Sequence, residues 1–353
     1  MEFLFTNYPP VKFSRRTFSD AFYEMIPKAT GLDIAVGYVS ADSIAELQKT
    51  IELNANIERL NLIVGMHYFE GFTEVQYNAA MGLNEYLISS SRGGVSLVTA
   101  FRYHGKLYSY SNNDGPFAGI IGSNNLSSIV DGGTRIYESS VLLDDKTSAQ
   151  EMSRFISSLS TRASKNIGDL DIRNFNEENA LLDGQEYVEK ATTREIVDAM
   201  KNVRSGFSFN IPIKPYEVSP QSNLNVFFGK GREARNGLVK PRHWYEVELI
   251  VPKEITTRPG YPQSQTESAV FDVITDDGWK FKCKVSGDYS KNFRSEGDLK
   301  ILGKWLKGRL ENKGALRVGE PVTRETLKKY GRDTFTLAQT ETPGLWYLDF
   351  GVK

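Results

Sequence analysis

The first half of the chain alternates short apolar runs with amphipathic segments, and this alternation restricts the folds open to it. Runs rich in β-branched residues predict buried strands at 33–39, 60–66 and 95–101. The segments between them, 41–53 and 73–89, carry apolar residues at helical spacing. Because alternating strands and helices pack as a largely parallel sheet covered by helices, we predict an α/β domain here.

The next predicted strands follow one another too closely for helices to intervene. Residues 107–110, 117–122 and 135–143 are rich in apolar and β-branched residues, and the polar stretch SNNDGP separates the first two. This spacing predicts an antiparallel portion of the same sheet. An amphipathic helix at 147–163 is expected to close the domain.

Polar side chains gather near the ends of these strands. His104 and Lys106 lie two residues apart, as do Ser123 and Asn125, and Glu138 lies in the third strand. Side chains two apart on a strand face the same side, so each pair is predicted to point into one space. An imidazole, an ammonium, a hydroxyl, a carboxamide and a carboxylate together suit attack on a phosphorus centre.

In this interpretation the His104 imidazole is the nucleophile or the proton carrier near neutral pH. Lys106, Ser123 and Asn125 bind the phosphoryl oxygens as negative charge grows in the transition state. Glu138 accepts a hydrogen bond from the other ring nitrogen and fixes the tautomer. The alternative is that His-x-Lys is a solvated strand edge and that Gly-Ser-Asn-Asn is an ordinary turn or helix cap.

The order H-x-K followed by G-S-x-N resembles the signature of the phospholipase D superfamily. The resemblance rests on His104, Lys106, Gly122, Ser123 and Asn125, with Glu138 at the position of the family's supporting acid. It implies that the histidine attacks a phosphodiester to give a covalent phosphohistidine, that a second histidine protonates the leaving oxygen, and that no metal is needed. Ser111 stands where the family often has an aspartate.

The chain holds one copy of the H-x-K motif, whereas this chemistry uses two histidines. We therefore expect a homodimer in which a twofold axis brings two copies of His104 into one composite site. His67, which follows the predicted strand 60–66, is the alternative second histidine. It otherwise has a structural or substrate-positioning role.

The second half of the chain differs from the first in charge. Residues 201–353 hold 26 Lys and Arg against 18 Asp and Glu, although the whole chain has a net charge of −1. A positive excess is what a module that binds a polyanion requires, and the alternative is an evenly charged, solvated surface. We predict a catalytic domain at 1–168, a linker with helical pieces at 169–205 and a DNA-binding domain at 206–353.

Short strands with few helices predict a mostly-β pseudobarrel for this second domain. The predicted strands are 207–211, 225–228, 244–251, 269–274, 279–285 and 344–350, with one helix at 298–311. The helical pieces of the linker are predicted at 187–202.

Two loops of this domain are rich in cations and amides. Arginine and lysine can contact guanine, asparagine can contact adenine, and further cations can hold phosphates. The predicted DNA-binding residues are Lys230, Arg232, Arg235, Asn236, Lys240 and Arg242 in the first loop and Tyr289, Ser290, Lys291, Asn292 and Arg294 in the second. The alternative is that both segments are plain surface loops.

A basic β domain with two such loops, fused to a one-motif phospholipase D domain, resembles the NgoAVII/NgoFVII group of restriction endonucleases, which is related to BfiI. The resemblance implies a type II-like restriction endonuclease, a hydrolase that cleaves double-stranded DNA at a specific site without a metal. It also implies a partnering DNA methyltransferase and, in the NgoAVII branch, an ATPase subunit. Any dependence on ATP would then come only from this partner subunit. Rival interpretations are a structure-directed or RNA nuclease, a phospholipid-transferring enzyme and a non-catalytic DNA-binding regulator.

Other sequence properties narrow the kind of protein that this chain can be. One cysteine, Cys283, allows no disulfide within the chain. The three histidines are far apart and lack metal-ligand spacing. No apolar run approaches the roughly 20 residues that span a bilayer, and the N-terminus lacks a signal-peptide pattern. We therefore expect a cytoplasmic protein. The resemblance implies that the protein is bacterial and that its chemistry requires no cofactor.

Overall fold

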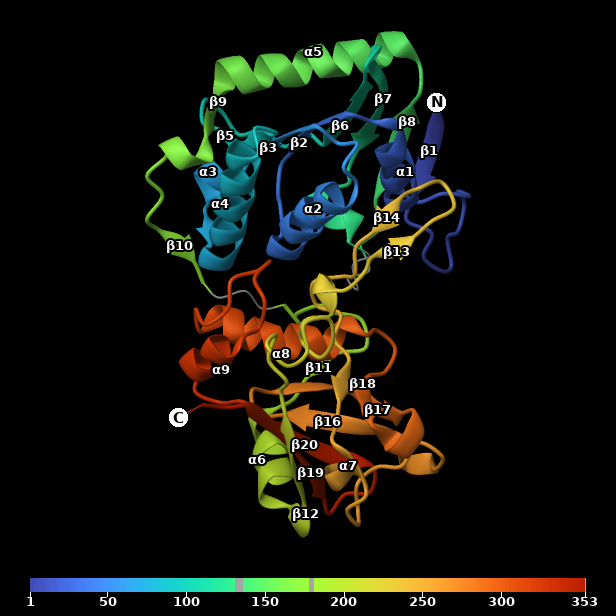
Figure 1. The fold of residues 1–353 in the computed structure, drawn as a ribbon, viewed down its shortest axis with the longest axis vertical. Helices are drawn as coiled ribbons and strands as arrows, with labels where there is room; N and C mark the ends of the chain where they lie inside the picture. The colour runs from blue at the N-terminus through green and yellow to red at the C-terminus, as the bar shows by residue number, and fades with distance from the viewer. Residues whose placement is uncertain (131–135, 178–180, 353) are drawn as a thin grey trace. The chain divides into compact units, whose positions relative to one another are not determined.

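The chain forms two compact units in a computed structural model that describes residues 1–130, 136–177 and 181–352 (Figure 1). Unit 1 consists of Met1–Glu178 together with Gly231–Pro241, and unit 2 consists of Asn179–Lys230 together with Arg242–Lys353. A short segment from the second half of the sequence therefore folds with the first half. Each unit is built around its own 8-stranded sheet.

Unit 1 has a mixed sheet with a parallel centre. Strands β2, β3 and β5 run parallel, and the other neighbours pair antiparallel. The order across the sheet is β1 (Glu2–Phe5), β8 (Ser139–Leu143), β7 (Gly115–Gly122), β6 (Leu107–Asn112), β2 (Gly31–Val36), β3 (Arg59–Val64), β5 (Gly93–Val98) and β9 (Ser164–Asn166). The predicted α/β domain with an antiparallel portion is confirmed, and Arg135 of the predicted strand 135–143 lies outside the described residues.

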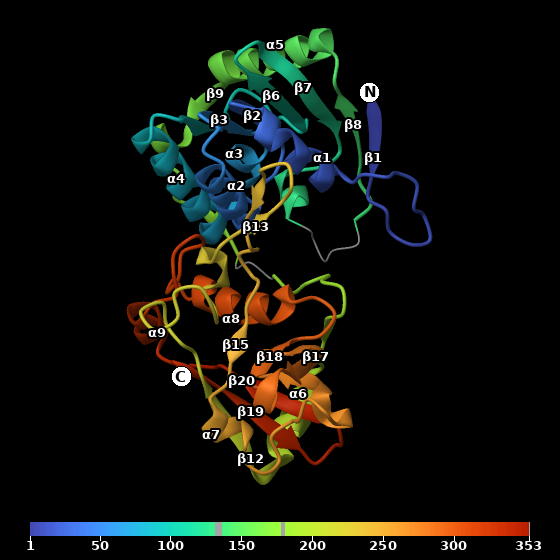
Figure 2. The ribbon, with the colours of Figure 1, turned by 45° about the vertical axis from the view of Figure 1, so that its right-hand side comes forward.

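Helices cover both faces of this sheet. One face carries α5 (Lys146–Ala163), and the other carries α1 (Phe18–Met25), α2 (Ala41–Leu53) and α4 (Glu74–Ser89), as Figures 1 and 2 show from two sides. The shorter elements of unit 1 are η1 (Ile26–Lys28), α3 (His67–Glu70), η2 (Leu126–Ile129), η3 (Ile167–Asp169) and the parallel pair β4 (Phe72–Thr73) and β10 (Phe175–Asn176).

The amphipathic pattern of α5 explains its place on the sheet. Its apolar side chains Met152, Ile156 and Leu159 recur at helical spacing and pack on Ala35 and Ile63 of the central strands. Burial of these side chains stabilises the sheet from the α5 side by the hydrophobic effect.

Unit 2 is a curled, mostly antiparallel sheet that forms a half-barrel. Its strand order is β12 (Val203–Pro212), β19 (Thr334–Thr340), β20 (Leu345–Asp349), β16 (Val270–Thr275), β17 (Trp279–Ser286), β18 (Asn292–Ser295) and β15 (Leu249–Ile250), with β11 (Glu189–Lys190) paired to β17. Among the described strands of unit 2, only β16 and β20 pair in parallel. Helical elements are α6 (Thr193–Lys201), η4 (Val226–Phe228), α7 (Lys253–Thr256), η5 (Glu267–Ala269), η6 (Asp288–Ser290), α8 (Lys300–Asn312) and α9 (Arg324–Tyr330).

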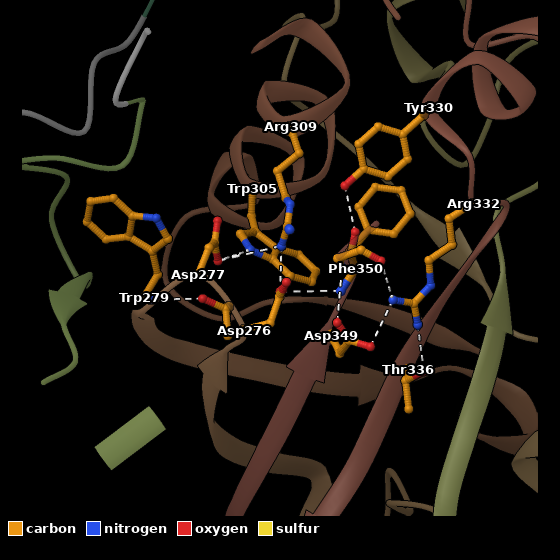
Figure 3. Close-up of polar contacts among 12 residues, drawn as sticks. Asp276, Asp277, Trp279, Trp305, Arg309, Tyr330, Arg332, Thr336, Asp349 and Phe350 are labelled. Atoms are coloured by element: carbon orange, nitrogen blue, oxygen red, sulfur yellow. Dashed lines mark hydrogen bonds and ion pairs between the residues drawn. The ribbon is translucent and has the colours of Figure 1, made fainter. Parts of the chain in front are cut away.

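A polar network fastens the helices of unit 2 to its sheet (Figure 3). Arg309 and Trp305 of α8 bind Asp276 and Asp277 in the turn after β16. The Tyr330 hydroxyl at the end of α9 donates to the carbonyl of Phe350 at 2.6 Å. In the same network Arg332 binds Asp349 and Thr336. These contacts join α8 to the turn after β16, and α9 with the residues after it to the end of β20.

Two predicted strands of unit 2 are wrong. The range 225–228 is the 3₁₀ helix η4, and within 244–251 only Leu249–Ile250 is a strand. Phe227 and Trp244 are buried edge to face with ring centroids 5.2 Å apart. Aromatic residues therefore fill the core from turns here, although their composition resembles that of strands. The sequence interpretation also missed β18, β19 and α9.

Candidate active site and DNA-binding segments

The candidate catalytic groups meet at one edge of the unit 1 sheet. Strands β2 and β3 end at this edge, and β6 begins there because Leu107 pairs with Ala35 near the end of β2. Strand β7 also ends there, since Gly122 N donates to Lys106 O at 3.4 Å. Strand β8 begins beside it at Ser139. The topology thus brings together two motifs that are separate in the sequence.

His104 and Lys106 contact each other directly. Lys106 Nζ lies 3.1 Å from both ring nitrogens of His104 and donates to the His104 carbonyl at 2.7 Å. A neutral imidazole has one unprotonated nitrogen, so only one of the two can accept from the ammonium at a time, and that nitrogen is also the one that can act as a nucleophile. His104 is exposed, whereas Lys106 is only 6% exposed. The pair therefore presents an accessible ring next to a buried cation.

Two effects act on the charge of Lys106. Removal from water lowers the pKa of Lys106, and the negative charge of Glu138 raises it. Glu138 thus favours the charged lysine that would bind a phosphate oxygen. Within the described part of the chain, no hydrogen bond joins the Glu138 carboxylate to the His104 ring. The predicted role of Glu138 in orienting His104 stays a prediction.

The turn after β7 uses its two asparagines differently. Asn124 is buried, where its side chain accepts from the Ser140 hydroxyl at 2.6 Å and its carbonyl from the Tyr108 hydroxyl at 2.9 Å. Asn125 is half-buried, and its Oδ1 accepts from the backbone N–H of Tyr38 at 3.1 Å. Among the described residues nothing binds Asn125 Nδ2, so this donor is available to a phosphate oxygen.

Ser123 and Gly122 join β7 to β8. The Ser123 hydroxyl accepts from Ser139 N at 3.0 Å and donates to Ser139 O at 3.2 Å. A Cβ at Gly122 would lie 2.1 Å from Ser140 Oγ, so a glycine is needed where the strands come this close. The Ser123 hydroxyl is exposed, and its predicted role in phosphate binding would require it to exchange Ser139 for substrate.

His67 lies at the same sheet edge in a different environment. Its Nδ1 is 2.8 Å from the carbonyl of Gly71, to which it donates, and its Nε2 accepts from Val39 N at 3.2 Å. The ring is 6% exposed and stacks on Phe72 with centroids 4.3 Å apart. Burial lowers the pKa of His67. Both ring nitrogens are bound to backbone groups, which favours a structural role over that of a second catalytic histidine.

Ser111 occupies the opposite end of β6 from His104. It lies five residue steps along the chain from Lys106, about 17 Å at the usual rise of a strand. Its hydroxyl accepts from Arg59 at 3.2 Å, and the same guanidinium pairs with Asp33. The residue at which the chain departs from the phospholipase D pattern therefore lies outside the candidate site.

The first basic loop forms a hairpin that belongs to unit 1. Its strands are β13 (Arg232–Glu233) and β14 (Val239–Lys240). Asn54, which follows α2, donates to Val239 O at 2.9 Å and accepts from Val239 N at 3.0 Å. Lys240 Nζ lies 4.5 Å from the centre of the Tyr23 ring. The hairpin is thus fixed to the helices α1 and α2, at the end of α2 remote from His104.

The cations of this loop are not equivalent. Arg232, Arg235 and Asn236 are exposed on the hairpin, and Lys230 is exposed before it in unit 2. Arg242 is half-buried and forms two hydrogen bonds with the Glu246 carboxylate, at 2.9 and 2.6 Å. These bonds raise the pKa of Arg242 and occupy its guanidinium. Arg242 therefore braces the base of the loop.

The second basic loop has an unusual backbone. Tyr289 and Ser290 both adopt the left-handed conformation, with φ of 57° and 55°. The Ser290 side chain is buried, accepts from Ser264 N at 2.8 Å and donates to Gln263 at 3.2 Å. These bonds hold the loop in its strained form and leave Tyr289 exposed.

Only part of the second predicted segment is a loop. Lys291 is half-buried and lies 3.9 Å from Asp288, whereas Asn292 and Arg294 are part of β18. Both alternate with the buried Phe293 and share the opposite face of the strand. A base-reading role for these two residues stays a prediction.

The sequence interpretation missed two residues that contact the predicted ones. The Tyr38 ring lies 5.6 Å from the ring of His104, and Lys253 Nζ lies 4.0 Å from the centre of the Tyr289 ring. Tyr38 lies two residues after the end of the buried strand β2, a position from which it could have been inferred. The contact of Lys253 depends on how α7 packs and has no local signal in the sequence.

Metal-binding clusters and membrane-spanning helices are absent from the described residues. In the described ranges, no group of three or more His, Cys, Asp or Glu side chains is arranged to hold a metal ion. No helix among the described residues is long and apolar enough to cross a membrane. Cys283 is buried, which raises the pKa of its thiol.

Several solved structures resemble about half of the chain. A phosphatidylserine synthase from Haemophilus influenzae Rd KW20 is 16% identical over 48% of this chain and 41% of its own, with a TM-score of 0.35. Nuc, a phospholipase D family member from Salmonella typhimurium, is 12% identical over 47% of this chain and 95% of its own, with a TM-score of 0.30. A polyphosphate kinase from Porphyromonas gingivalis is 11% identical over 47% of this chain and 24% of its own, with a TM-score of 0.31. This chain thus spans less than half the length of the synthase, and no curated protein matches it.

Two family models match separate parts of the chain and together take in most of its length. Residues 16–171 match the NgoFVII restriction endonuclease N-terminal PLD domain, where PLD denotes phospholipase D. Residues 199–341 match the NgoFVII C-terminal B3-like DNA-binding domain. The matches confirm the predicted combination of a phospholipase D-like domain with a DNA-binding β domain. The chain therefore belongs to the NgoFVII restriction endonuclease family.

Proposed function

We propose that this protein is a type II-like restriction endonuclease that cleaves double-stranded DNA at a specific site by phosphohistidine chemistry. Membership of the family supports a nuclease role and DNA as a partner. The observation that carries the chemistry is the 3.1 Å contact between the exposed His104 ring and the buried Lys106 ammonium. Asn125 Nδ2 supplies a further donor at the same edge of the sheet.

The first step forms a bond between His104 and the DNA. The unprotonated ring nitrogen attacks phosphorus, the P–N bond forms, and the P–O bond to the leaving oxygen breaks. A second, protonated histidine gives its proton to that oxygen. Lys106 and Asn125 donate to the non-bridging oxygens, whose charge increases in the transition state.

The second step removes the DNA from the protein. The second histidine, now neutral, takes a proton from water as the water oxygen attacks phosphorus. The P–N bond breaks, the cut strand is left with one phosphate monoester end and one hydroxyl end, and both histidines return to their starting states. The electrons and protons balance without a metal or another cofactor.

The second histidine is assigned to a second copy of the chain. His67 has both ring nitrogens bound to backbone groups, so His104 of another copy is the better candidate. Exposed apolar side chains lie in segments that begin or end at the same sheet edge, namely Phe69, Phe101, Ile121 and Tyr137. An apolar rim of this kind suits contact with a second copy around a composite site.

A DNA methyltransferase and an ATPase subunit are proposed as partners of the same restriction system.

The test is cleavage of plasmid DNA in excess EDTA. We expect discrete fragments from the wild type and from Lys165→Met, an exposed lysine on β9, and none from His104→Ala. Wild-type cutting by His104→Ala would overturn the assignment, and cutting that returns only with added Mg²⁺ would overturn metal independence. If the wild type shifts DNA without cutting it, the reaction is repeated without EDTA, with Mg²⁺, ATP and the ATPase partner. Failure there would favour a DNA-binding regulator.

A further inference from the structure

Tyr38 lies between the two histidines of unit 1. Its ring centroid is 5.6 Å from that of His104, with an angle of 78° between the planes, and 5.5 Å from that of His67, with an angle of 90°. Both are edge-to-face arrangements, which aromatic rings prefer to a face-to-face sandwich. A single ring therefore contacts the exposed candidate nucleophile and the buried histidine behind it.

Tyr38 is itself held by polar contacts. Its backbone N–H donates to Asn125, and its hydroxyl donates to Glu70 Oε2 at 2.6 Å. The bond to Glu70 raises the pKa of Tyr38, so the phenol keeps its proton near neutral pH. The preceding residue, Gly37, lies so close that a Cβ there would be 3.1 Å from His104 Cδ2. Gly37 and Tyr38 together form a wall against which the His104 ring rests.

The support behind Tyr38 is rigid. His67 is buried, both its ring nitrogens are bound to backbone groups, and its ring lies nearly parallel to that of Phe72, at 13°. Movement of His67 would break two buried hydrogen bonds, which is costly in a protein interior. The Tyr38 ring therefore cannot swing back from His104 without disturbing a satisfied core.

We propose that Tyr38 is a positioning residue that holds the His104 ring in the orientation for attack on phosphorus. This proposal rests on the proposed function, in which His104 is the nucleophile. Among the described residues, the hydrogen bonds to the His104 ring nitrogens come from Lys106 alone, and Lys106 lies equally far from both. Such a contact leaves rotation of the ring poorly defined. The edge-to-face contact with Tyr38 supplies the missing restraint.

Two substitutions separate the ring of Tyr38 from its hydroxyl. Tyr38→Leu removes the ring, whereas Tyr38→Phe keeps the ring and removes the bond to Glu70. Tyr86→Leu is the matched control, because Tyr86 is a half-buried tyrosine of the same unit on α4. The substrate is bis(p-nitrophenyl) phosphate, a phosphodiester without a base sequence, so that DNA recognition does not enter the measurement.

A misplaced reacting group costs up to about 100-fold in rate, so we expect Tyr38→Leu to lower kcat by about 10- to 100-fold with KM changed by less than about threefold. Tyr38→Phe should retain most of the wild-type kcat, and Tyr86→Leu should match the wild type. A Tyr38→Leu enzyme with wild-type kcat would overturn the proposal. So would a Tyr38→Phe enzyme as slow as Tyr38→Leu, because the hydroxyl would then be the important group.

A second measurement needs no catalytic activity. The chain has three histidines, so protein labelled with ¹³C-histidine gives three ring signals, and His104→Ala identifies that of His104. We expect Tyr38→Leu to shift this signal and to show faster ring motion, and Tyr38→Phe to preserve it. An unchanged His104 signal in Tyr38→Leu would overturn the positioning role even if the protein cleaves DNA. If the signals behave as expected but the wild type hydrolyses no phosphodiester, the positioning contact stands and the proposed function fails.

Discussion

The two units display their candidate functional groups in opposite ways. In unit 1, the ends of several strands bring His104, Lys106 and Asn125 to one edge of the sheet, and buried contacts fix their places. In unit 2, the candidate DNA-binding side chains are spread over a strained loop and a strand, and Arg242 is already engaged by a carboxylate. Four further candidates lie on the hairpin of unit 1.

This contrast follows from what the two tasks require. Bond formation at phosphorus depends on the placement of a few atoms, so each of them contributes heavily to the rate. Attraction to a polyanion is the sum of many charges, each of which contributes a little. We therefore expect single substitutions to act strongly on cleavage and weakly on binding.

The largest expected effect is that of His104→Ala. Loss of the nucleophile should lower the single-turnover cleavage rate by at least about 10⁴-fold, because the covalent route is closed. His104 is exposed, so the thermal midpoint and the affinity for DNA should stay near those of the wild type. Rapid-quench cleavage and a gel shift on the same preparation measure both. A cleavage rate of His104→Ala within tenfold of the wild-type rate would show that the reaction does not depend on this residue.

Lys106→Met comes next. Methionine fills much of the same buried space but supplies no charge to the phosphoryl oxygens or to the His104 ring, so cleavage should slow by about 10²- to 10³-fold. Lys165→Met on the edge strand β9 is the matched control and should leave the rate unchanged. If the Lys106→Met enzyme were as fast as this control, the buried Lys106 ammonium would have no part in the reaction.

Substitutions of single loop cations should have small effects on binding. Arg235→Gln and Lys291→Gln should each weaken DNA binding by less than about tenfold and reduce the slope of log K against log salt by about 0.9 if each neutralises one phosphate. Arg242→Gln is the control, because its guanidinium is bound to Glu246 and should contribute no salt dependence. Titrations at several salt concentrations measure the slopes. If one of these substitutions abolished binding, DNA recognition would depend on a single residue, as the chemistry does. The contrast between the two units would then fail.

The smallest expected effect is a loss of folding stability in acid, caused by the buried His67 of unit 1. His67 is neutral in its buried site, and its folded pKa is below its ordinary value near 6.5. The unfolded chain therefore binds a proton first, so this stabilisation is complete above about pH 6.5 and is lost as the pH falls through the folded pKa. The His67→Gln variant should have a lower thermal midpoint than the wild type at pH 7.5. On acidification to pH 5, however, its midpoint should fall by less than that of the wild type. Thermal scans of both proteins test this, and parallel pH curves would contradict it.

The sequence predicted unit 1 better than unit 2 for a physical reason. Buried parallel strands and amphipathic helices leave periodic patterns, so β2, β3, α2, α4 and α5 were found close to their actual bounds. In unit 2, Phe227 and Trp244 fill the core from turns, and composition alone made these turns look like strands. The hydroxyl- and amide-containing strand β19 (Thr334–Thr340) lacked the apolar run that would have identified it.

The sequence by itself determined which chemical groups form the candidate site, because the order and spacing of His104, Lys106, Ser123 and Asn125 are properties of the chain. All four lie just outside the strands, before β6 and after β7, so the alternation of side chains along a strand does not place them. Only the tertiary structure decided which contacts these groups make. It placed Tyr38 against His104, committed His67 to backbone groups and moved the first basic loop onto unit 1 through Asn54. These contacts join residues from separate elements, and their packing depends on the complete fold, so no local pattern records them.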